Sequence, residues 1–502
     1  MRQLMLSFDG LTPPPAILDA ITQGQIAAFC LFGAMNVASP ASLRALTDAL
    51  RAAARHGGQL PPLIGIDQEG GQLQAITGST ELPGNLALGA TRSPELAYGA
   101  GVVLGRELRA MGLNLNFAPA LDVNINPANP VIGTRAFGDN PALIAELGVA
   151  MIHGMQDQGI IATAKHFPGH GDTGVDTHFA APILDHPADR IESVELPPFQ
   201  AAIRAGVGAV MTGHIILSAY DPDQPATLSR ALLTDLLRGR FGFDGLILTD
   251  AMDMHAVARL GHANSVSMAL AAGVDLVTLA HLPDQLGLLQ QFAGRENPAS
   301  IARIEAAQRR AALDPLPLDI VRSREHQQIA QEIADRSITL VKDIGRLPLR
   351  PDADAQIAVI TPEPVDLTPA DTSSWTRITL AEQVRAFHAN TVGFQMPRSA
   401  SAHEITALLR AVESAEAVIV GTISADTDPG QAELVKALIR RGQQPVVVAL
   451  RTPYDLIAFP QVDTYLCAYS IRTPSLKAAA RVLFGQIEAQ GVLPCVIPAH
   501  QP

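Results

Sequence analysis

The sequence predicts an α/β protein in which a (β/α)8 TIM-like barrel is followed by a second α/β sandwich domain. The chain has 502 residues, about three times the length of a typical domain, so two domains are expected. Up to about residue 290, short apolar runs alternate with longer segments of helical periodicity. Eight such runs can be counted, and eight strands close a parallel barrel.

The elements follow from this alternation in chain order. The predicted barrel strands are residues 4–8, 27–32, 62–66, 113–117, 161–164, 208–212, 245–249 and 274–279. Helical segments lie between them, including 39–55, 93–111, 141–158, 192–205 and 229–240, and several begin with a capping Ser or an early Pro. We expect the barrel over 1–298, a helical connector over 299–345, and the second domain over 346–502, with strands at 357–360, 417–420, 446–450 and 465–468.

A doubly wound open sheet would show the same periodicity, so the residues that follow the strands decide between the two folds. Ionisable residues come directly after five of the eight runs: Asp67, Asp122, Lys165 with His166, His214 and Asp250. Such groups gathered at the ends of many strands are typical of the C-terminal face of a (β/α)8 barrel.

Composition excludes several classes of partner. Lys and Arg number 36 against 49 Asp and Glu, a net charge of −13, which disfavours nucleic acid. Aromatic residues make up 4% and include one tryptophan, so any sugar ligand is expected to be small.

The three cysteines, Cys30, Cys467 and Cys495, lie in or beside apolar stretches, which favours a reducing compartment. With neither a signal peptide nor a membrane span recognisable, we expect a cytoplasmic protein.

The densest group of chemically active residues is the segment 165–178, KHFPGHGDTGVDTH, whose glycines and proline predict an irregular loop. In an extended stretch Asp176 and His178 point the same way, so the carboxylate can orient the imidazole and raise its basicity. An isolated Asp-x-His is more often structural. Asp250 ends an apolar strand, where it can act as nucleophile or base, or cap a helix. Asp253 is expected on a helix surface.

These residues are similar to the signature of family 3 glycoside hydrolases of the β-N-acetylglucosaminidase branch. That signature, K-H-[FI]-P-G-[HL]-G-x4-D-[ST]-H, matches residues 165–178 at every fixed position. Further likenesses are DQEGG at 67–71, NPVIG at 129–133, RAFG at 135–138, PATLS at 225–229 and LTD at 248–250, with weaker ones in the second domain.

The resemblance implies a retaining exo-acting hydrolase that removes terminal β-linked N-acetylglucosamine, or another N-acetylhexosamine, without a cofactor or metal. By position, Asp250 matches the nucleophile, His178 the acid/base and Asp176 the partner of that histidine. Asp67, Arg135, Lys165 and His166 match sugar-binding positions. His214 is a further substrate-binding candidate, and for it and Asp122 a structural role is equally plausible. We expect no catalytic residue in the second domain.

One departure from the family pattern concerns sugar recognition. The pattern continues as D-Q-E-G-G-R-V-x-R, but Gln72 and Ala75 stand in place of the two arginines. The loss at Ala75 removes a donor to the substrate.

A second expectation comes from the histidine acid/base, which is neutral after it gives up its proton and so would not repel an anion. We hypothesise that inorganic phosphate could compete with water at the second step.

Three alternatives remain at this stage. A metal-dependent barrel hydrolase would use the histidines and aspartates of 165–178, but Lys165 would stand beside the metal. A β-glucosidase or β-xylosidase of the same family would take its acid/base from elsewhere, against the complete Asp-Thr-His ending. A non-catalytic sugar-binding protein would account for the missing arginines. Muropeptide fragments or chitobiose, in cell-wall or chitin recycling, are the expected substrates by analogy alone.

Overall fold

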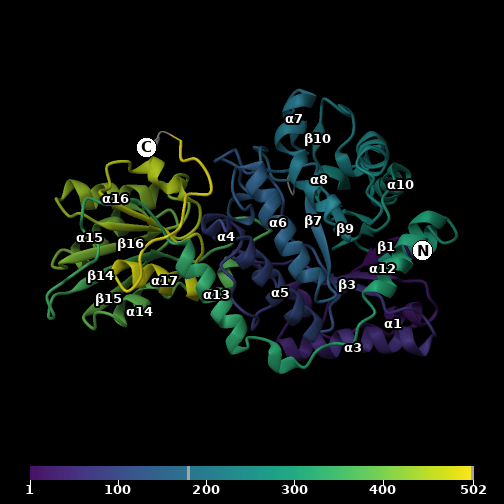
Figure 1. Cartoon of the computed structure of the whole chain (residues 1–502), viewed down its shortest axis with the longest axis horizontal. Helices are drawn as coiled ribbons and strands as arrows, with labels where there is room; N and C mark the ends of the chain where they lie inside the picture. The colour runs from purple at the N-terminus through teal and green to yellow at the C-terminus, as the bar shows by residue number, and fades with distance from the viewer. Residues whose placement is uncertain (178–180, 499–502) are drawn as a thin grey trace.

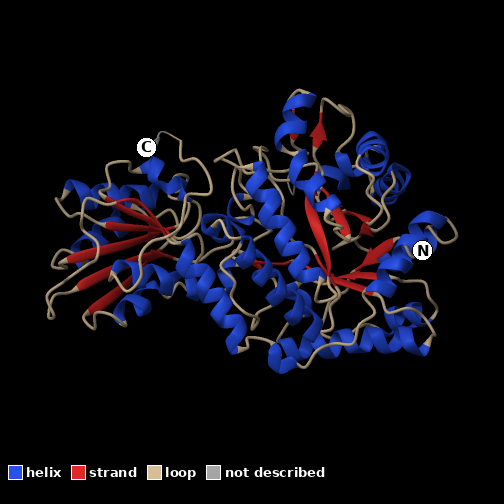
Figure 2. Ribbon diagram, viewed as in Figure 1, coloured by secondary structure: helices blue, strands red, loops and turns tan. Residues whose placement is uncertain are grey.

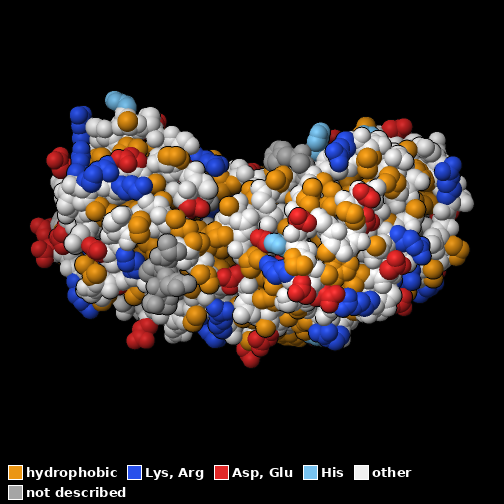
Figure 3. Space-filling model, turned by 90° about the horizontal axis from the view of Figure 1, so that it is seen from above, with side chains coloured by type: hydrophobic (Ala, Val, Ile, Leu, Met, Phe, Trp, Pro, Cys, Tyr) orange, Lys and Arg blue, Asp and Glu red, His pale blue; other side chains and the backbone are white. Residues whose placement is uncertain are grey.

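The protein consists of two lobes joined by a long helix, as Figure 1 shows. A computed structural model describes residues 1–177 and 181–498. The first lobe carries an eight-stranded parallel sheet and the second a six-stranded sheet. Figure 2 shows helices around both sheets. On the face seen in Figure 3, acidic and basic side chains are interspersed, and the outline is indented between the lobes.

The eight predicted barrel strands are all present, and the fold prediction is confirmed. In chain order they are β1 (Leu4–Leu6), β2 (Ala28–Cys30), β3 (Leu63–Ile66), β6 (Leu115–Asn116), β7 (Ile161–Phe167), β9 (Ala209–Thr212), β11 (Leu246–Thr249) and β12 (Val277–Thr278). The sheet runs β11-β9-β7-β6-β3-β2-β1-β12. A parallel bridge between Leu248 and Leu276 brings its two edges together and nearly closes the barrel. Nearly all residues of these strands are fully buried, which accounts for their continuous apolar runs.

Helices and short strands surround this barrel. The helices are α1 (Pro15–Thr22), α2 (Gly33–Asn36), α3 (Pro40–His56), α4 (Asn85–Thr91), α5 (Pro94–Ala110), η1 (Gly133–Arg135), α6 (Pro141–Gln156), α7 (Ala188–Val194), α8 (Leu196–Arg204), η2 (Ala226–Leu228), η3 (Ala231–Arg240), α9 (His255–Ala258), α10 (His262–Ala272), α11 (Gln285–Gln291) and α12 (Pro298–Arg310). Two strand pairs are added, β4 (Gln68–Gly70) with β5 (Leu73–Gln74), and β8 (Ile183–Leu184) with β10 (Ile216–Leu217).

Two helices differ from the sequence prediction. The segment expected as one helix over 192–205 is divided between α7 and α8. Pro197 and Pro198 follow the division, and proline belongs in the first turn of a helix, because it lacks the N–H that an interior position donates. The segment 231–240 is a π-helix rather than an α-helix.

The lobes are connected through η4 (Leu318–Ile320) and α13 (Arg324–Ser337). The buried carboxylate of Glu107 on α5 anchors this connection. It lies 2.8 Å from Nδ1 of His326 and accepts hydrogen bonds from the backbone N–H of Arg322 at 2.8 Å and of Thr80 at 2.9 Å. α13 is thereby held against the barrel.

The second lobe is a three-layer α/β/α sandwich. Its strands are β13 (Thr339–Lys342), β14 (Ile357–Pro362), β15 (Thr391–Met396), β16 (Ala417–Thr422), β17 (Val446–Ala449) and β18 (Thr464–Cys467), in the order β13-β18-β17-β16-β14-β15. All pair in parallel except β13, which is antiparallel to β18. Alternate side chains pack against α15 (Ala402–Ala411) and α16 (Pro429–Arg440) on one face, and against α13, α14 (Leu380–Arg385) and α17 (Thr473–Leu483) on the other. Two short helices, η5 (Ser373–Trp375) and η6 (Pro453–Ala458), complete the lobe.

Two strands of the second sheet were absent from the sequence prediction. β13 lies within the range expected as a connector. β15 is an edge strand in which only the two end residues are buried and the four between them are partly or fully exposed, so it lacks a continuous buried apolar run.

Candidate active site

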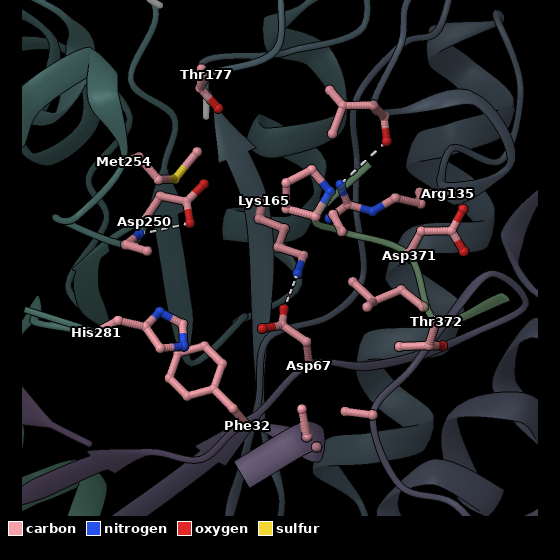
Figure 4. A pocket seen from close by; sticks show the side chains of 18 of the residues that line it. Phe32, Asp67, Arg135, Lys165, Thr177, Asp250, Met254, His281, Asp371 and Thr372 are labelled. Atoms are coloured by element: carbon pink, nitrogen blue, oxygen red, sulfur yellow. Dashed lines mark hydrogen bonds and ion pairs between the residues drawn. The ribbon is translucent and has the colours of Figure 1, made fainter. Parts of the chain in front are cut away.

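A cavity of about 450 Å³ lies at the C-terminal ends of the barrel strands, where the second lobe meets the barrel. Five predicted site residues line it: Asp67 after β3, Arg135 in η1, Lys165 and His166 at the end of β7, and Asp250 after β11. Figure 4 shows Asp250 on one side of the cavity, Arg135 on the other and Lys165 with Asp67 between them. Strands distant in sequence therefore bring these side chains together.

Lys165 stands between two carboxylates at the centre of the cavity floor. Its Nζ lies 2.5 Å from Oδ1 of Asp67 and 2.7 Å from Oε1 of Glu69. Burial alone would lower the pKa of Lys165, but the two carboxylates outweigh burial and raise it. Lys165 is therefore a fixed positive charge.

Glu69 was not singled out by the sequence analysis, although it lies in the DQEGG segment. Its carboxylate accepts two hydrogen bonds from Arg135, at 3.0 Å from Nε and 2.8 Å from Nη2. Burial would raise the pKa of Glu69, but Arg135 and Lys165 together lower it to about 2. A carboxylate this acidic stays ionised and orients both cations.

His166 is fixed from both sides of its ring. Nδ1 lies 2.8 Å from Oδ2 of Asp122 and Nε2 lies 3.2 Å from Nη2 of Arg135. Because a carboxylate only accepts and a guanidinium only donates, this arrangement corresponds to the tautomer with the proton on Nδ1. Asp122 is thus a positioning residue for His166.

Asp250 presents an ionised carboxylate to the cavity. Its Oδ1 accepts a hydrogen bond from the backbone N–H of Ala251 at 2.8 Å. Burial would raise its pKa, but the neighbouring His166, His214 and Lys165 side chains and the Ala251 N–H lower it below the ordinary value. A carboxylate at the tip of a strand and ionised at neutral pH has the properties of a nucleophile.

His214 is buried beside Asp250 and is absent from the described lining of the cavity. Its Nδ1 lies 2.7 Å from Oγ1 of Thr227 and its Nε2 lies 3.0 Å from the carbonyl oxygen of Ala251. These contacts place His214 against the backbone that carries Asp250, where it can set the position of the carboxylate.

The loop that follows β7 is held by backbone contacts. Asp122 accepts hydrogen bonds from the N–H groups of His166 at 3.2 Å and of His170 at 2.7 Å. At Gly171 a Cβ atom would lie 1.9 Å from the carbonyl oxygen of Val123, so only glycine fits there. The backbone of the loop at Gly171 therefore packs directly against the backbone at Val123.

The two members of the predicted acid/base pair are not both described. Asp176 is buried, Thr177 lines the cavity, and His178 lies outside the described residues. His170 also lines the cavity, but burial, followed by the nearby His166, lowers its pKa to about 4. It is neutral at physiological pH, so it does not carry a proton ready for donation.

The second lobe forms one wall of the cavity through residues 369–375. The indole of Trp375 is 41% exposed and lies so close to α2 that a Cβ atom on Gly33 would come within 2.9 Å of it. Thr372 accepts a hydrogen bond from the N–H of Gln74 at 3.0 Å, which fixes the wall to the barrel. The segment carries no recognisable motif, so this wall could not be predicted from the sequence.

Two arginines of the second lobe reach the segment where the family arginines are missing. Arg451 donates to Oε1 of Gln72 and, at 2.7 Å, to Asp371. Arg472 donates from Nε to the carbonyl oxygen of Gly71 at 2.8 Å. Neither arginine is among the described lining residues, whereas Ala75 is. They hold the segment in place and do not restore a donor at Ala75.

Asp253 lines the cavity, and its expected place on a helix surface is wrong. The N–H of Met252 donates to the carbonyl oxygen of Thr278 at 3.0 Å, so the chain follows β12 before α9 begins. Asp253 thereby reaches His281, with 2.9 Å between Oδ2 and Nδ1. The ring of His281 packs against Phe32 at a centroid distance of 4.3 Å.

The cavity thus combines an ionised carboxylate with several donors and acceptors suited to hydroxyl groups.

The three cysteines are all buried and free. No helix in the described ranges has the length and apolar character needed to cross a membrane.

Comparison with known proteins gives the family. The Glycosyl hydrolase family 3 N terminal domain matches residues 5–312, and the Glycosyl hydrolase family 3 C-terminal domain matches residues 338–502. The chain is 30% identical to beta-hexosaminidase A of Pseudoalteromonas piscicida, over 97% of this chain and 92% of that protein. It is 36% identical to a beta-hexosaminidase of Nitrosomonas eutropha, over 60% of this chain and 87% of that one.

A solved structure agrees over nearly the whole length. The family 3 beta-N-acetylglucosaminidase from Paenibacillus sp. str. FPU-7 superposes with a TM-score of 0.92 at 35% identity, covering 99% of this chain and 98% of that chain. With both lobes matched, this chain belongs to glycosyl hydrolase family 3.

Proposed function

We propose that this glycosidase removes terminal β-linked N-acetylglucosamine, or another N-acetylhexosamine, from the non-reducing end of a small substrate. The observation that carries the proposal is the ionised carboxylate of Asp250 at the edge of a cavity whose floor holds Lys165 and Arg135. The names of the relatives from Pseudoalteromonas and Paenibacillus support the choice of sugar.

In the proposed reaction, Asp250 attacks the anomeric carbon and the bond from that carbon to the leaving oxygen breaks. His178 gives its proton to the leaving oxygen, and Asp176 orients the imidazole. A water molecule then attacks the glycosyl ester while His178 takes up a proton, which regenerates Asp250 and releases the sugar. Two displacements at one carbon retain its configuration.

Asp67, Arg135, Lys165 and His166 are proposed to bind the sugar in this scheme. Contacts with Glu69 fix Arg135 and Lys165, and a contact with Asp122 fixes His166, before the sugar arrives, which lowers the entropic cost of binding. For His214 the contact with the carbonyl oxygen of Ala251 favours a positioning role over direct binding.

The test uses 4-nitrophenyl glycosides of β-N-acetylglucosamine and β-glucose. We expect the wild type to prefer the N-acetylglucosaminide, to retain the β-configuration by NMR, and to be unaffected by a chelator. Asp250→Asn keeps the size of the side chain and removes its charge, so turnover should fall by at least about 1,000-fold. Undiminished turnover in that variant would sink the assignment of the nucleophile.

A β-glucosidase remains the second candidate. One relative from Cellulomonas fimi is named a beta-N-acetylglucosaminidase/beta-glucosidase, and it shares 36% identity over 58% of this chain. Ala75 supports this reading, since it removes a substrate-contacting donor. A higher kcat/KM for the glucoside would favour it over the first proposal.

Phosphate is included as an alternative acceptor. If a neutral His178 tolerates an anion at the second step, the assay in phosphate buffer should yield N-acetylglucosamine 1-phosphate, detectable by ³¹P NMR. Release of the free sugar alone, at an unchanged rate, would leave hydrolysis as the reaction.

We further propose a reducing location such as the cytoplasm, with a role in turnover of cell-wall or chitin fragments. The free, buried thiols of Cys30, Cys467 and Cys495 support the reducing environment. Fractionation of cells with an antibody against the chain tests the location, and an extracellular pool would contradict it.

A further inference from the structure

The chain between Asp172 and His186 carries both members of the proposed acid/base pair, Asp176 and His178. The two ends of this segment, the acid/base loop (residues 172–186), meet in space. Oδ2 of Asp172 lies 2.6 Å from Nε2 of His186, although the two residues are 14 positions apart in the sequence. A contact between the ends of a loop restricts the conformations of the chain that it encloses.

The end of the loop at His186 is anchored to the first lobe. β8 lies in this part of the loop and pairs in parallel with β10. The N–H of Ile216 donates to the carbonyl oxygen of Pro182 at 2.9 Å, and the N–H of Ser218 donates to that of Leu184 at 3.3 Å. α7 begins two residues after His186, and Figure 1 shows α7 and β10 together at one end of the first lobe. His186 is therefore a fixed support for the carboxylate that it contacts.

Arg190 on α7 places a cation beside the same carboxylate. Its Nη2 lies 3.7 Å from Oδ2 of Asp172, and its Nη1 donates to both carboxylate oxygens of Glu195, at 2.9 and 2.8 Å. Glu195 is almost fully buried and packs against the segment that precedes the loop, because a Cβ atom on Gly169 would lie 3.0 Å from its Cβ and Cγ atoms. Two contacts therefore join the start of the loop to the segment that follows its end.

From this contact the loop leads into the catalytic cavity. Asp176 and Thr177 are both buried, and Thr177 lines the cavity. Oγ1 of Thr177 lies 3.4 Å from Nε2 of His170, another residue of the lining. Figure 4 shows Thr177 at the edge of the cavity, above Asp250. The residue directly before His178 therefore faces the groups that react.

The residues that join the ends of the loop lie away from the substrate. Asp172, His186 and Arg190 are all outside the described lining of the cavity, so an effect of these residues on the reaction has to pass through the loop. In the signature of residues 165–178, Asp172 falls at one of the four unspecified positions, and His186 and Arg190 lie beyond its end. The signature therefore gives none of the three a role.

We propose that Asp172, His186 and Arg190 form a clamp that holds the acid/base loop and positions His178 for proton transfer. The inference rests on the proposed function and deepens it, because it assigns positioning residues to the acid/base step. A proton donor has to lie within hydrogen-bond distance of the leaving oxygen, and a displacement of about 1 Å can lower a rate about 100-fold. Loss of the clamp should therefore slow the departure of leaving groups that need a proton and spare those that do not.

The test compares two aryl glycosides of β-N-acetylglucosamine that differ in this need. 2,4-Dinitrophenolate departs without a proton, whereas phenolate requires one. In His186→Ala, kcat/KM should fall about ten- to thirtyfold for the phenyl glycoside and about threefold or less for the dinitrophenyl glycoside. The ratio kcat/KM is the appropriate measure, because it reports cleavage of the bond to the leaving group and not the second step. Equal losses on the two substrates would contradict the clamp.

Further variants show whether the residues act through one contact. His186→Gln keeps a donor for Asp172 and should recover part of the loss on the phenyl glycoside. Asp172→Ala removes the carboxylate and should show the same selectivity as His186→Ala. The double variant of Asp172→Ala with His186→Ala should lose no more than Asp172→Ala alone, because both changes break the same contact. Losses that multiply would show independent roles and would overturn the proposal.

A control and a stability measurement exclude a general effect on folding. His56→Ala, exposed at the end of α3, should leave both substrates unaffected. The side chains of His186 and Asp172 are 36% and 19% exposed, so the clamp variants should keep their Tm within about 3 °C of the wild type. A larger fall in Tm, together with equal losses on the two substrates, would assign the residues to stability and contradict the proposal.

His178→Ala distinguishes failure of the clamp from failure of the proposed function. It should lose at least about 100-fold in kcat/KM on the phenyl glycoside and far less on the dinitrophenyl glycoside. Equal losses in His178→Ala would overturn the acid/base assignment of the proposed function, and the clamp with it. A selective loss in His178→Ala, with His186→Ala indistinguishable from His56→Ala, would overturn only the clamp.

Discussion

The guanidinium of Arg135 and the carboxylate of Glu69 form a two-point ion pair, with distances of 2.8 and 3.0 Å, at a place where both side chains are almost fully buried. Lys165 approaches the same carboxylate at 2.7 Å. One buried anion therefore orients two of the cations that line the cavity. Because the three charges are coupled, removing the anion should disturb both stability and binding.

Glu69→Gln preserves the shape of the side chain and removes its charge. We expect a loss of about 3 kcal/mol in the free energy of unfolding of the barrel, because two buried cations lose their shared partner. Urea denaturation followed by circular dichroism measures this loss. The control Glu305→Gln affects a surface ion pair with Arg2 and should cost no more than about 1 kcal/mol. Similar denaturation midpoints in the two variants would contradict the buried role.

The same residue gives a pH dependence with a defined sign. The folded pKa of Glu69 is about 2, below its ordinary value of 4.5, so its stabilisation is complete above pH 4.5 and is lost as the pH falls toward 2. In Glu69→Gln this part of the acid dependence should be missing. A variant that follows the same acid unfolding curve as the wild type would show that another group is responsible.

Arg451 links the second lobe to the barrel at the wall of the cavity, through Asp371 and Gln72. Arg451→Met should loosen the wall, and we expect KM for the aryl N-acetylglucosaminide to rise about three- to tenfold with a smaller change in kcat. Arg451→Lys should recover part of the effect. Arg377→Met, whose side chain is 82% exposed, serves as the control. A fall in kcat alone would indicate a disturbance of the reacting groups rather than of the wall.

Trp375 is the single tryptophan of the chain and lines the catalytic cavity. A bound sugar should displace water from the indole, so saturating N-acetylglucosamine is expected to shift its fluorescence emission to shorter wavelength. The shift should follow a single-site titration, and Trp375→Phe should abolish the signal. An emission spectrum that does not respond while the same sugar inhibits turnover would show that the indole lies outside the occupied space.

Asp455 in η6 is a fully buried carboxyl group in the second lobe. Burial, with a contribution from Asp426, raises its pKa to about 7. The folded state therefore holds this proton more tightly than the unfolded state, and stability falls as the pH rises from about 4 to 7. Asp455→Asn should remove that loss and stabilise the second lobe by about 2–4 kcal/mol at pH 8, with little effect at pH 4.

Thermal unfolding of the wild type and Asp455→Asn over this pH range provides the measurement. The N–H of Ala425 donates a hydrogen bond to Oδ1 of Asp455 at 2.8 Å. The side-chain oxygen of asparagine can accept the same hydrogen bond, so the variant keeps this contact. The exposed Asp352→Asn is the control and should follow the wild type. A Tm difference between Asp455→Asn and the wild type that is independent of pH would contradict the assignment.

The barrel could be predicted because its strands are buried on both sides and therefore read as continuous apolar runs. β15 was not predicted because an edge strand buries only some of its residues, and Thr391 and Met396 alone are fully buried in it. The positions of Asp67, Lys165 and Asp250 followed from a rule of the fold, since each lies at or just after the end of a strand.

Contacts between distant loops had no such rule. The sequence places Asp253 on a helix. In the structure, the hydrogen bond from the N–H of Met252 to the carbonyl oxygen of Thr278 makes the chain follow β12 first, and the sequence alone does not show this contact. Trp375 and Asp371 lie more than 120 residues beyond Asp250 in a segment without a motif. Their approach to the cavity depends on how the two lobes dock against each other. The one sequence signal for Trp375 is that it is the only tryptophan in the chain.

The wall formed by residues 369–375 has a thermodynamic consequence for the two lobes. A ligand that fills the cavity contacts both lobes, so binding and docking are linked equilibria. Ligand at 100 times its Kd adds about 2.7 kcal/mol to the free energy that holds the bound arrangement together, provided that the separated lobes do not bind it. From this linkage we expect a bound ligand to join the two lobes reversibly, so that the lobes separate more readily after it is released.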